Sequence, residues 1–164
     1  RNMVNEDKYS NITFLVEGQK VNAHLTILAG RCEHFAAMFW SGMRESVERE
    51  IAIPNISKTV FILLMEYLYT DSVKVELEYA VELFMIADLY QLDRLRDICC
   101  AVVKRNLTVE NAPMLLQSSA DVHCQTLKDI CMEFVVTNFD SISKKDEIKA
   151  VSHTLLLEIL SNRP

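Results

Sequence analysis

The sequence predicts an α+β fold in which a small mixed unit, residues 1–106, precedes an all-helical segment, residues 107–164. Short stretches of the first part alternate apolar and polar residues, which is the pattern of half-buried strands, whereas only helical spacing remains beyond Asn106. Half of the 164 residues are hydrophobic and only three are glycine and three proline. This composition is typical of a compact, mostly helical protein rather than a disordered or fibrous one.

The first elements expected are a hairpin and two short helices. Ile12, Phe14 and Val16 alternate with polar neighbours, and Gly18 turns the chain, so residues 11–23 predict a hairpin. Helical spacing follows, and it stops first at Gly30 and then at Gly42. Each glycine suits a left-handed C-terminal cap, so we expect the two helices to end there.

The rest of the mixed unit predicts two more strands and three helices. Alternation returns over residues 48–53 and again over residues 73–75, and each stretch predicts a short strand. Ser57 is a candidate cap for the helix between them. Two further amphipathic helices carry apolar faces at Ala80, Leu83, Phe84 and Ala87, and at Leu92, Leu95, Cys99 and Val102.

Beyond residue 106 we expect only helices. Pro113 is tolerated in the first turn of a helix and disrupts one further in, so the first helix is expected to begin near Asn111 rather than at Thr108. Later apolar faces occur at Leu127, Ile130, Cys131 and Phe134, and at Leu155, Leu156, Ile159 and Leu160.

Charge and cysteine content exclude several classes of partner. Lys and Arg number 17 against 23 Asp and Glu, for a net charge of −6, and no basic run exceeds two residues. No nucleic-acid partner is therefore expected. No apolar run approaches the roughly 20 residues that span a bilayer, so no membrane span is expected. Five cysteines, an odd number placed within helical patterns, favour an intracellular, reducing compartment.

No motif in the chain predicts catalysis, a cofactor or a metal ion. The three glycines stand twelve residues apart, whereas nucleotide-binding loops need closely spaced glycines, and no Cys-x-x-Cys pair is present. His24 lies where a strand is expected to give way to a helix. We expect its ring to bond backbone groups at that corner, because no nucleophile motif accompanies it.

The segment from Phe39 to Glu45 contains the only tryptophan, Trp40, together with a methionine, Met43. Two interpretations are open. Trp40 and Met43 are interface anchors in a loop, with Glu45 adding a polar contact, or Trp40 covers the helix below it.

Several stretches in order resemble the BTB (POZ) domain family. They are residues 11–18 (NITFLVEG), 23–24 (AH), 28–35 (LAGRCEHF), 38–39 (MF), 53–54 (IP), 61–70 (FILLMEYLYT) and 83–90 (LFMIADLY). Residues 107–111 (LTVEN) and the helices expected after them resemble the BACK domain that often follows a BTB domain. The resemblance covers nearly the whole chain and implies a BTB fold, a small mixed sheet flanked by helices, followed by the N-terminal part of a BACK domain.

The resemblance implies a non-catalytic adaptor. BTB–BACK proteins commonly bind the N-terminal region of the cullin-3 scaffold and present a protein substrate, held by other domains, for ubiquitination. The family contacts cullin through a hydrophobic-x-Glu motif in a loop, which Met43-Arg44-Glu45 matches in this chain. The full set of cullin-binding candidates is Trp40, Met43, Arg44, Glu45, Asp88, Tyr90, Asn111, Met114 and Leu115.

Self-association is the alternative that the resemblance leaves open. Many dimeric members carry an acidic residue before the first strand and a basic one after Ala-His, where this chain has Asn11 and Leu25. We expect these two residues at any homodimer interface, and losing both charges avoids leaving one buried and unpaired. On this alternative the chain is a homotypic oligomerisation module of a transcriptional or cytoskeletal regulator that does not bind cullin.

Overall fold

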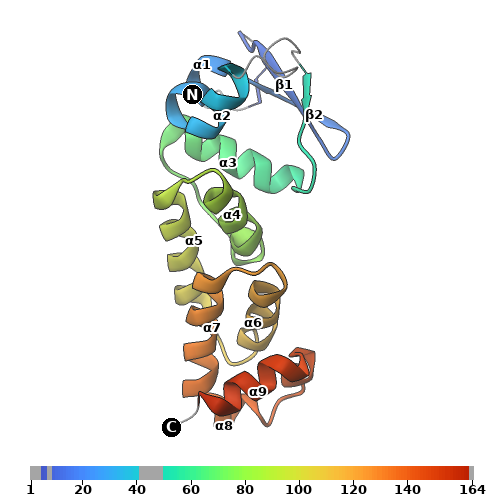
Figure 1. Ribbon diagram of the computed structural model, residues 1–164, viewed down its shortest axis with the longest axis vertical. Coiled ribbons are helices and arrows are strands. Elements are labelled where there is room, and N and C mark those ends of the chain that lie inside the picture. The colour runs from blue at the N-terminus through green and yellow to red at the C-terminus, as the bar shows by residue number, and fades with distance from the viewer. Residues whose placement is uncertain (1–4, 7–8, 41–49, 163–164) are drawn as a thin grey trace. The chain divides into compact units, whose positions relative to one another are not determined.

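A computed structural model of the chain describes residues 5–6, 9–40 and 50–162 (Figure 1). The residues form two compact units, 1–98 and 99–164. The division falls inside helix α5, which runs over Asp93–Asn106. The domain boundary expected after residue 106 stays a prediction.

The first unit begins with the predicted hairpin. Strands β1 (Ile12–Val16) and β2 (Gln19–Ala23) are antiparallel and are joined by Glu17 and Gly18. Both turn residues have positive φ angles, 51° and 73°, which is the geometry of a tight two-residue hairpin turn. Strand β3 (Glu50–Ala52) lies parallel to β1, so the sheet order is β2-β1-β3.

Among the described residues, the helices that precede α5 in this unit are α1 (Leu25–Arg31), α2 (Glu33–Trp40), α3 (Lys58–Thr70) and α4 (Leu77–Leu89). Ser57 caps α3 as predicted, since its hydroxyl accepts the Val60 N–H at 3.4 Å. The Ser57 N–H and hydroxyl also donate to the Glu82 carboxylate of α4, at 2.6 and 2.9 Å. The start of α3 is therefore tied to α4.

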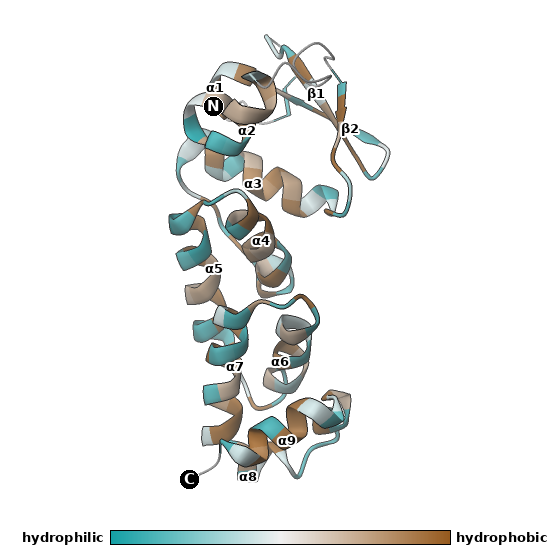
Figure 2. Cartoon of the chain, viewed as in Figure 1, coloured by the Kyte–Doolittle hydropathy of each residue, from teal (hydrophilic) through white to brown (hydrophobic). Residues whose placement is uncertain are grey.

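An aromatic cluster lies between the sheet and the helices. Phe14 of β1, Phe35 of α2 and Phe61 of α3 are completely buried. The Phe14 ring centroid lies 5.6 Å from that of Phe35 and 5.2 Å from that of Phe61. Figure 2 shows the apolar residues concentrated along α3. Burying three such side chains ties both helices to the central strand.

Two local expectations are wrong. Helix α1 does not end at Gly30 but continues to Arg31, and Gly30 lacks a left-handed φ angle because Cys32 closes the helix from an extended conformation. Gly42 lies outside the described residues. Residues 73–75 form no strand, because the described part of the sheet offers no neighbour to which they pair.

The second unit contains helices α6 (Ala112–Asp121), α7 (Gln125–Thr137), α8 (Phe139–Ile142) and α9 (His153–Ser161), with a short 3-10 helix, η2 (Asp146–Ala150). Helix α6 begins directly after Asn111 with Pro113 in its first turn, as expected. Helices α6 and α7 pack side by side (Figure 1). Within the described ranges, no helix is both long enough and apolar enough to cross a bilayer.

The cysteines differ in how deeply they are buried. Cys99 and Cys131 are completely buried, whereas Cys100 is partly exposed. Burial raises the pKa of the Cys99 thiol to about 12 and that of the Cys131 thiol to about 11. Because alkylating reagents attack the thiolate, both thiols are protected at moderate pH.

We predict that Cys100 is alkylated by iodoacetamide at pH 8 well before Cys99 and Cys131. Mass spectrometry of peptides taken over time measures the three rates, and a sample unfolded in urea is the control in which all three react. Equal rates for Cys99 and Cys100 in the folded protein would contradict the burial described here.

Candidate protein-docking site

Helix α2 presents Trp40 to solvent. Phe35 and Phe39 of α2 face the core, with 0% and 7% of their surface exposed, whereas Trp40 is 81% exposed. The next residue along a helix is rotated by about 100°, so anchoring Phe39 inward turns Trp40 outward. Trp40 therefore does not cover the helix below it, and a large aromatic surface is available to a partner.

The predicted hydrophobic-x-Glu motif follows Trp40 in the sequence. Met43, Arg44 and Glu45 lie outside the described residues, and their role stays a prediction. The chain resumes in β3 at Glu50, whose carboxylate pairs with Lys20 of β2 at 2.8 Å.

Helix α4 adds exposed apolar surface that the sequence analysis did not single out. Met85 and Leu89 are 38% and 64% exposed and stand four residues apart, on one face of the helix. The signal was present in the sequence, because both residues lie off the apolar face formed by Ala80, Leu83, Phe84 and Ala87. Asp88, a predicted contact, is exposed beside them, and its carboxylate pairs with Arg96 of α5.

Tyr90, another predicted contact, is buried, with 6% of its surface exposed. Its ring stacks on that of His34 with centroids 4.1 Å apart, and it meets the edge of Phe35 at 5.2 Å. Burial raises the pKa of the Tyr90 hydroxyl to about 12 and lowers the pKa of His34. Tyr90 is thus placed to hold α2 against the end of α4 rather than to offer surface to a partner.

A cleft of about 550 Å³ lies beside this stack. One wall is the corner between α1 and α2, and the other is the turn between α4 and α5. The lining residues are Arg31, Cys32, Glu33, His34, Leu89, Tyr90, Gln91, Leu92, Asp93 and Arg96. The Cys32 Sγ lies 3.9 Å from the Tyr90 carbonyl oxygen, which it faces as a weak donor. The exposed Leu89 therefore stands at the rim of a preformed depression.

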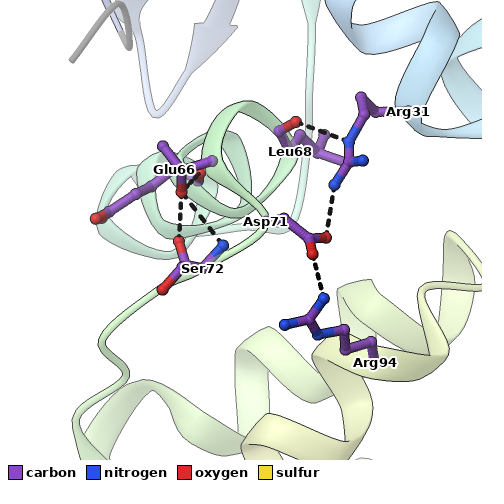
Figure 3. Close-up of polar contacts among 7 residues, drawn as sticks. Arg31, Glu66, Leu68, Asp71, Ser72 and Arg94 are labelled. Atoms are coloured by element: carbon purple, nitrogen blue, oxygen red, sulfur yellow. Dashed lines mark hydrogen bonds and ion pairs between the residues drawn. The ribbon is translucent and has the colours of Figure 1, made fainter. Parts of the chain in front are cut away.

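Asp71, at the end of α3, contacts the helices that form both walls (Figure 3). Its Oδ1 accepts from Arg31 Nη2 at 2.6 Å, and its Oδ2 accepts from Arg94 Nη1. The Arg31 Nε also donates to the Leu68 carbonyl at 3.2 Å. Nothing in the sequence pattern indicated this bridge, because its three residues are distant along the chain.

The predicted contacts in the second unit differ in exposure. Met114 is 59% exposed, whereas Leu115 is only 5% exposed and faces the core of its unit. Asn111 organises the start of α6: its Oδ1 accepts the Thr108 N–H and its Nδ2 donates to the Asn106 carbonyl, both at 2.8 Å. Of these three, Met114 offers the most surface to a partner.

Asn11 and Leu25, the residues expected at a homodimer interface, contact each other. The Asn11 Oδ1 accepts the Leu25 N–H at 2.8 Å, so Asn11 satisfies an amide at the start of α1. Leu25 is partly exposed. The side chain of Asn11 thus has a structural role within one chain.

The ring of His24 does not make the predicted contact with backbone groups. Its backbone N–H donates to the Tyr69 hydroxyl at 2.8 Å, and its Nδ1 lies 2.8 Å from the same oxygen. The partner is therefore a side chain of α3 rather than a backbone group at the corner. Among the described residues, no cluster of three His, Cys, Asp or Glu side chains has the geometry of a metal site.

Comparison with known proteins begins with protein families. A BTB/POZ domain model matches residues 1–107, and a model of the BACK domain, "BTB And C-terminal Kelch", matches residues 113–163. Two solved structures share the fold of the first unit. The BTB domain of zebrafish PATZ1 is 26% identical and covers 60% of this chain and 78% of its own, with a TM-score of 0.51. The BTB domain of human gigaxonin, 17% identical with a TM-score of 0.51, covers 58% of this chain and 78% of its own.

Curated relatives extend the similarity along the chain. The Arabidopsis thaliana "ARM repeat protein interacting with ABF2" is 36% identical over 140 residues, which is 85% of this chain and 20% of the relative. Zebrafish (Danio rerio) Kelch-like protein 21 is 30% identical over 96% of this chain and 26% of its own length. Human Kelch repeat and BTB domain-containing protein 4 is 28% identical over 96% of this chain and 29% of its own length. This chain thus spans less than a third of each of these relatives. It belongs to the BTB/POZ family, with a BACK domain following the BTB domain.

Proposed function

We propose that the chain is the scaffold-binding part of a non-catalytic adaptor, which docks on the N-terminal region of cullin-3 and presents a substrate held by other domains. The single observation that supports this most is the exposure of Trp40. A tryptophan that is 81% exposed lies three residues before Met43 in the sequence, and Met43-Arg44-Glu45 matches the family's hydrophobic-x-Glu motif. Burying so large an aromatic surface against a partner is a characteristic energetic anchor of protein interfaces.

The exposed surface of α4 supports the same proposal. Met85, Asp88 and Leu89 form an exposed strip that combines apolar area with one carboxylate. Interfaces are typically apolar at the centre and polar at the rim. In this proposal Trp40 and Met43 bury apolar surface, while Asp88 and Glu45 provide directed polar contacts and Arg44 contacts the rim.

The remaining candidates are assigned according to their exposure. Met114 contributes apolar contact area in the BACK domain. Asn111, Leu115 and Tyr90 act indirectly, because Asn111 shapes the start of α6 and the other two are largely buried. The domains run over residues 1–106 and 107–164 in this proposal, with the whole protein acting inside the cell in the ubiquitination pathway.

We predict that replacing both Met43 and Glu45 by alanine weakens binding to the N-terminal region of cullin-3 by at least about 30-fold. A hot-spot pair is worth about 2 kcal/mol or more, which corresponds to that factor in Kd. Isothermal titration calorimetry measures the affinity, and circular dichroism checks that the variant is folded. The matched control is Leu157→Ala with Glu147→Ala, which removes an exposed apolar and an exposed acidic side chain from the second unit. Undiminished affinity of the Met43/Glu45 variant would remove the proposed site.

Self-association through the surface around Asn11 and Leu25 is a second proposal, compatible with the first. Asn11 and Leu25 are uncharged, so a dimer that buries this surface leaves neither residue with an unpaired charge. If the chain self-associates and does not bind cullin, it is a homotypic oligomerisation module.

We predict that light scattering at micromolar concentration gives the mass of a dimer for the wild type and of a monomer for Leu25→Asp. Leu25 is the first residue of α1, where an acidic residue suits the helix N-terminus, so the substitution targets the interface and not the fold. Thr154→Asp, in the first turn of α9, is the control. A monomeric wild type that still binds cullin would exclude the self-association proposal, and a dimer that ignores cullin would exclude the adaptor proposal.

A further inference from the structure

Asp71 has a left-handed backbone conformation, which glycine adopts most readily and which aspartate tolerates. It ends helix α3 with φ 59° and ψ 17°, in the left-handed region, and its N–H closes the helix on the Tyr67 carbonyl at 2.8 Å. Glycine adopts this conformation without steric cost and is the usual residue at such a position. An aspartate at this position adds a carboxylate that glycine would lack.

The turn that carries Asp71 is held firmly on both sides. The Thr70 hydroxyl lies 2.7 Å from the carbonyl oxygens of both Glu66 and Ser72, and it accepts the Ser72 N–H at 3.3 Å. Figure 3 shows the Asp71 carboxylate pointing away from these contacts, between two guanidinium groups. These hydrogen bonds hold the backbone of the turn, and the ion pairs with Arg31 and Arg94 orient the carboxylate.

The two guanidinium groups come from opposite walls of the cleft. Arg31, the last residue of α1, lines one wall itself. Arg94 lies in the first turn of α5, between the lining residues Asp93 and Arg96 of the other wall. The Asp71 carboxylate therefore connects both walls without lining the cleft itself, whereas the stacked rings of His34 and Tyr90 connect them within its lining.

Global stability does not explain this arrangement. The paired side chains are 41% to 65% exposed, and ion pairs so accessible to water contribute little to folding. A residue other than the preferred glycine at such a cap, with no gain in stability, is expected where the structure serves binding.

We propose that Asp71 is a positioning residue that fixes the spacing between the α1–α2 corner and the α4–α5 turn, and thereby presents Leu89 and Asp88 to the scaffold partner. This inference rests on the proposed function. Asp71 does not contact the partner. It acts through Arg31 and Arg94, whose positions determine where the walls of the cleft stand.

The substitution Asp71→Gly separates positioning from stability. Glycine suits the left-handed cap, so the variant keeps α3 and its urea midpoint stays at or above that of the wild type. Both arginines lose the carboxylate that joins them, and Arg31 keeps only its bond to the Leu68 carbonyl. We expect the affinity for the N-terminal region of cullin-3 to fall about tenfold. Backbone amides of residues 32–34 and 90–94 should exchange hydrogen at least threefold faster. Asp71→Asn, which tolerates the same backbone conformation without the charge, should show the same changes.

The control is Asp146→Asn, which removes an exposed ion pair with Lys149 in the second unit and should change neither measurement. Wild-type affinity together with wild-type exchange in both Asp71 variants would overturn the inference. Faster exchange with unchanged affinity would also overturn it, since the walls would then move without consequence for binding. If the wild type itself does not bind the scaffold, the proposed function fails. In that case exchange alone decides whether Asp71 spaces the walls.

Discussion

The position of Phe35 is the constraint on which the rest of the first unit depends. Its ring contacts aromatic rings from β1, from α2 itself and from the end of α4: Phe14 at 5.6 Å, His34 at 6.1 Å, Phe39 at 6.0 Å and Tyr90 at 5.2 Å. Because Phe35 is completely buried, these contacts fix both the depth and the rotation of α2. The exposure of Trp40, the stack of His34 on Tyr90 and the cleft beside it all follow from that rotation.

The rotation of α2 therefore accounts both for the buried packing of its phenylalanines and for the exposure of Trp40. A short helix with Phe35 and Phe39 on its inner face has to place the residue after Phe39 outside. The end of α4 behaves in the same way, since Ala87 and Tyr90 face inward and leave Asp88 and Leu89 outside. The first unit thus exposes a tryptophan, Trp40, and a leucine, Leu89, that are not part of its core. That division suits a protein whose activity is to be bound by another protein.

Local patterns in the sequence predicted those elements that depend on neighbouring residues. They failed for features that depend on contacts with residues far away in the sequence. The hairpin, the Ser57 cap and the start of α6 near Asn111 depend on a few neighbouring residues, and the structure confirms them. Residues 73–75 have the alternation of a strand, but a strand also needs a neighbour, and alternation does not specify one. Gly30 was expected to end α1, yet the helix continues to Arg31, whose side chain binds the Leu68 carbonyl and Asp71. The site shows the same limit, because the burial of Tyr90 depends on α2, and the Asp71 bridge depends on three distant segments.

The most direct test of the account is to place a photo-reactive benzoylphenylalanine at position 40 and irradiate the complex with the N-terminal region of cullin-3. The account predicts a covalent adduct with cullin from position 40, and none from the same side chain placed at position 157, on the exposed face of α9. A complex that forms but gives no adduct from position 40 would contradict the docking surface, and the absence of any complex would contradict the adaptor function itself.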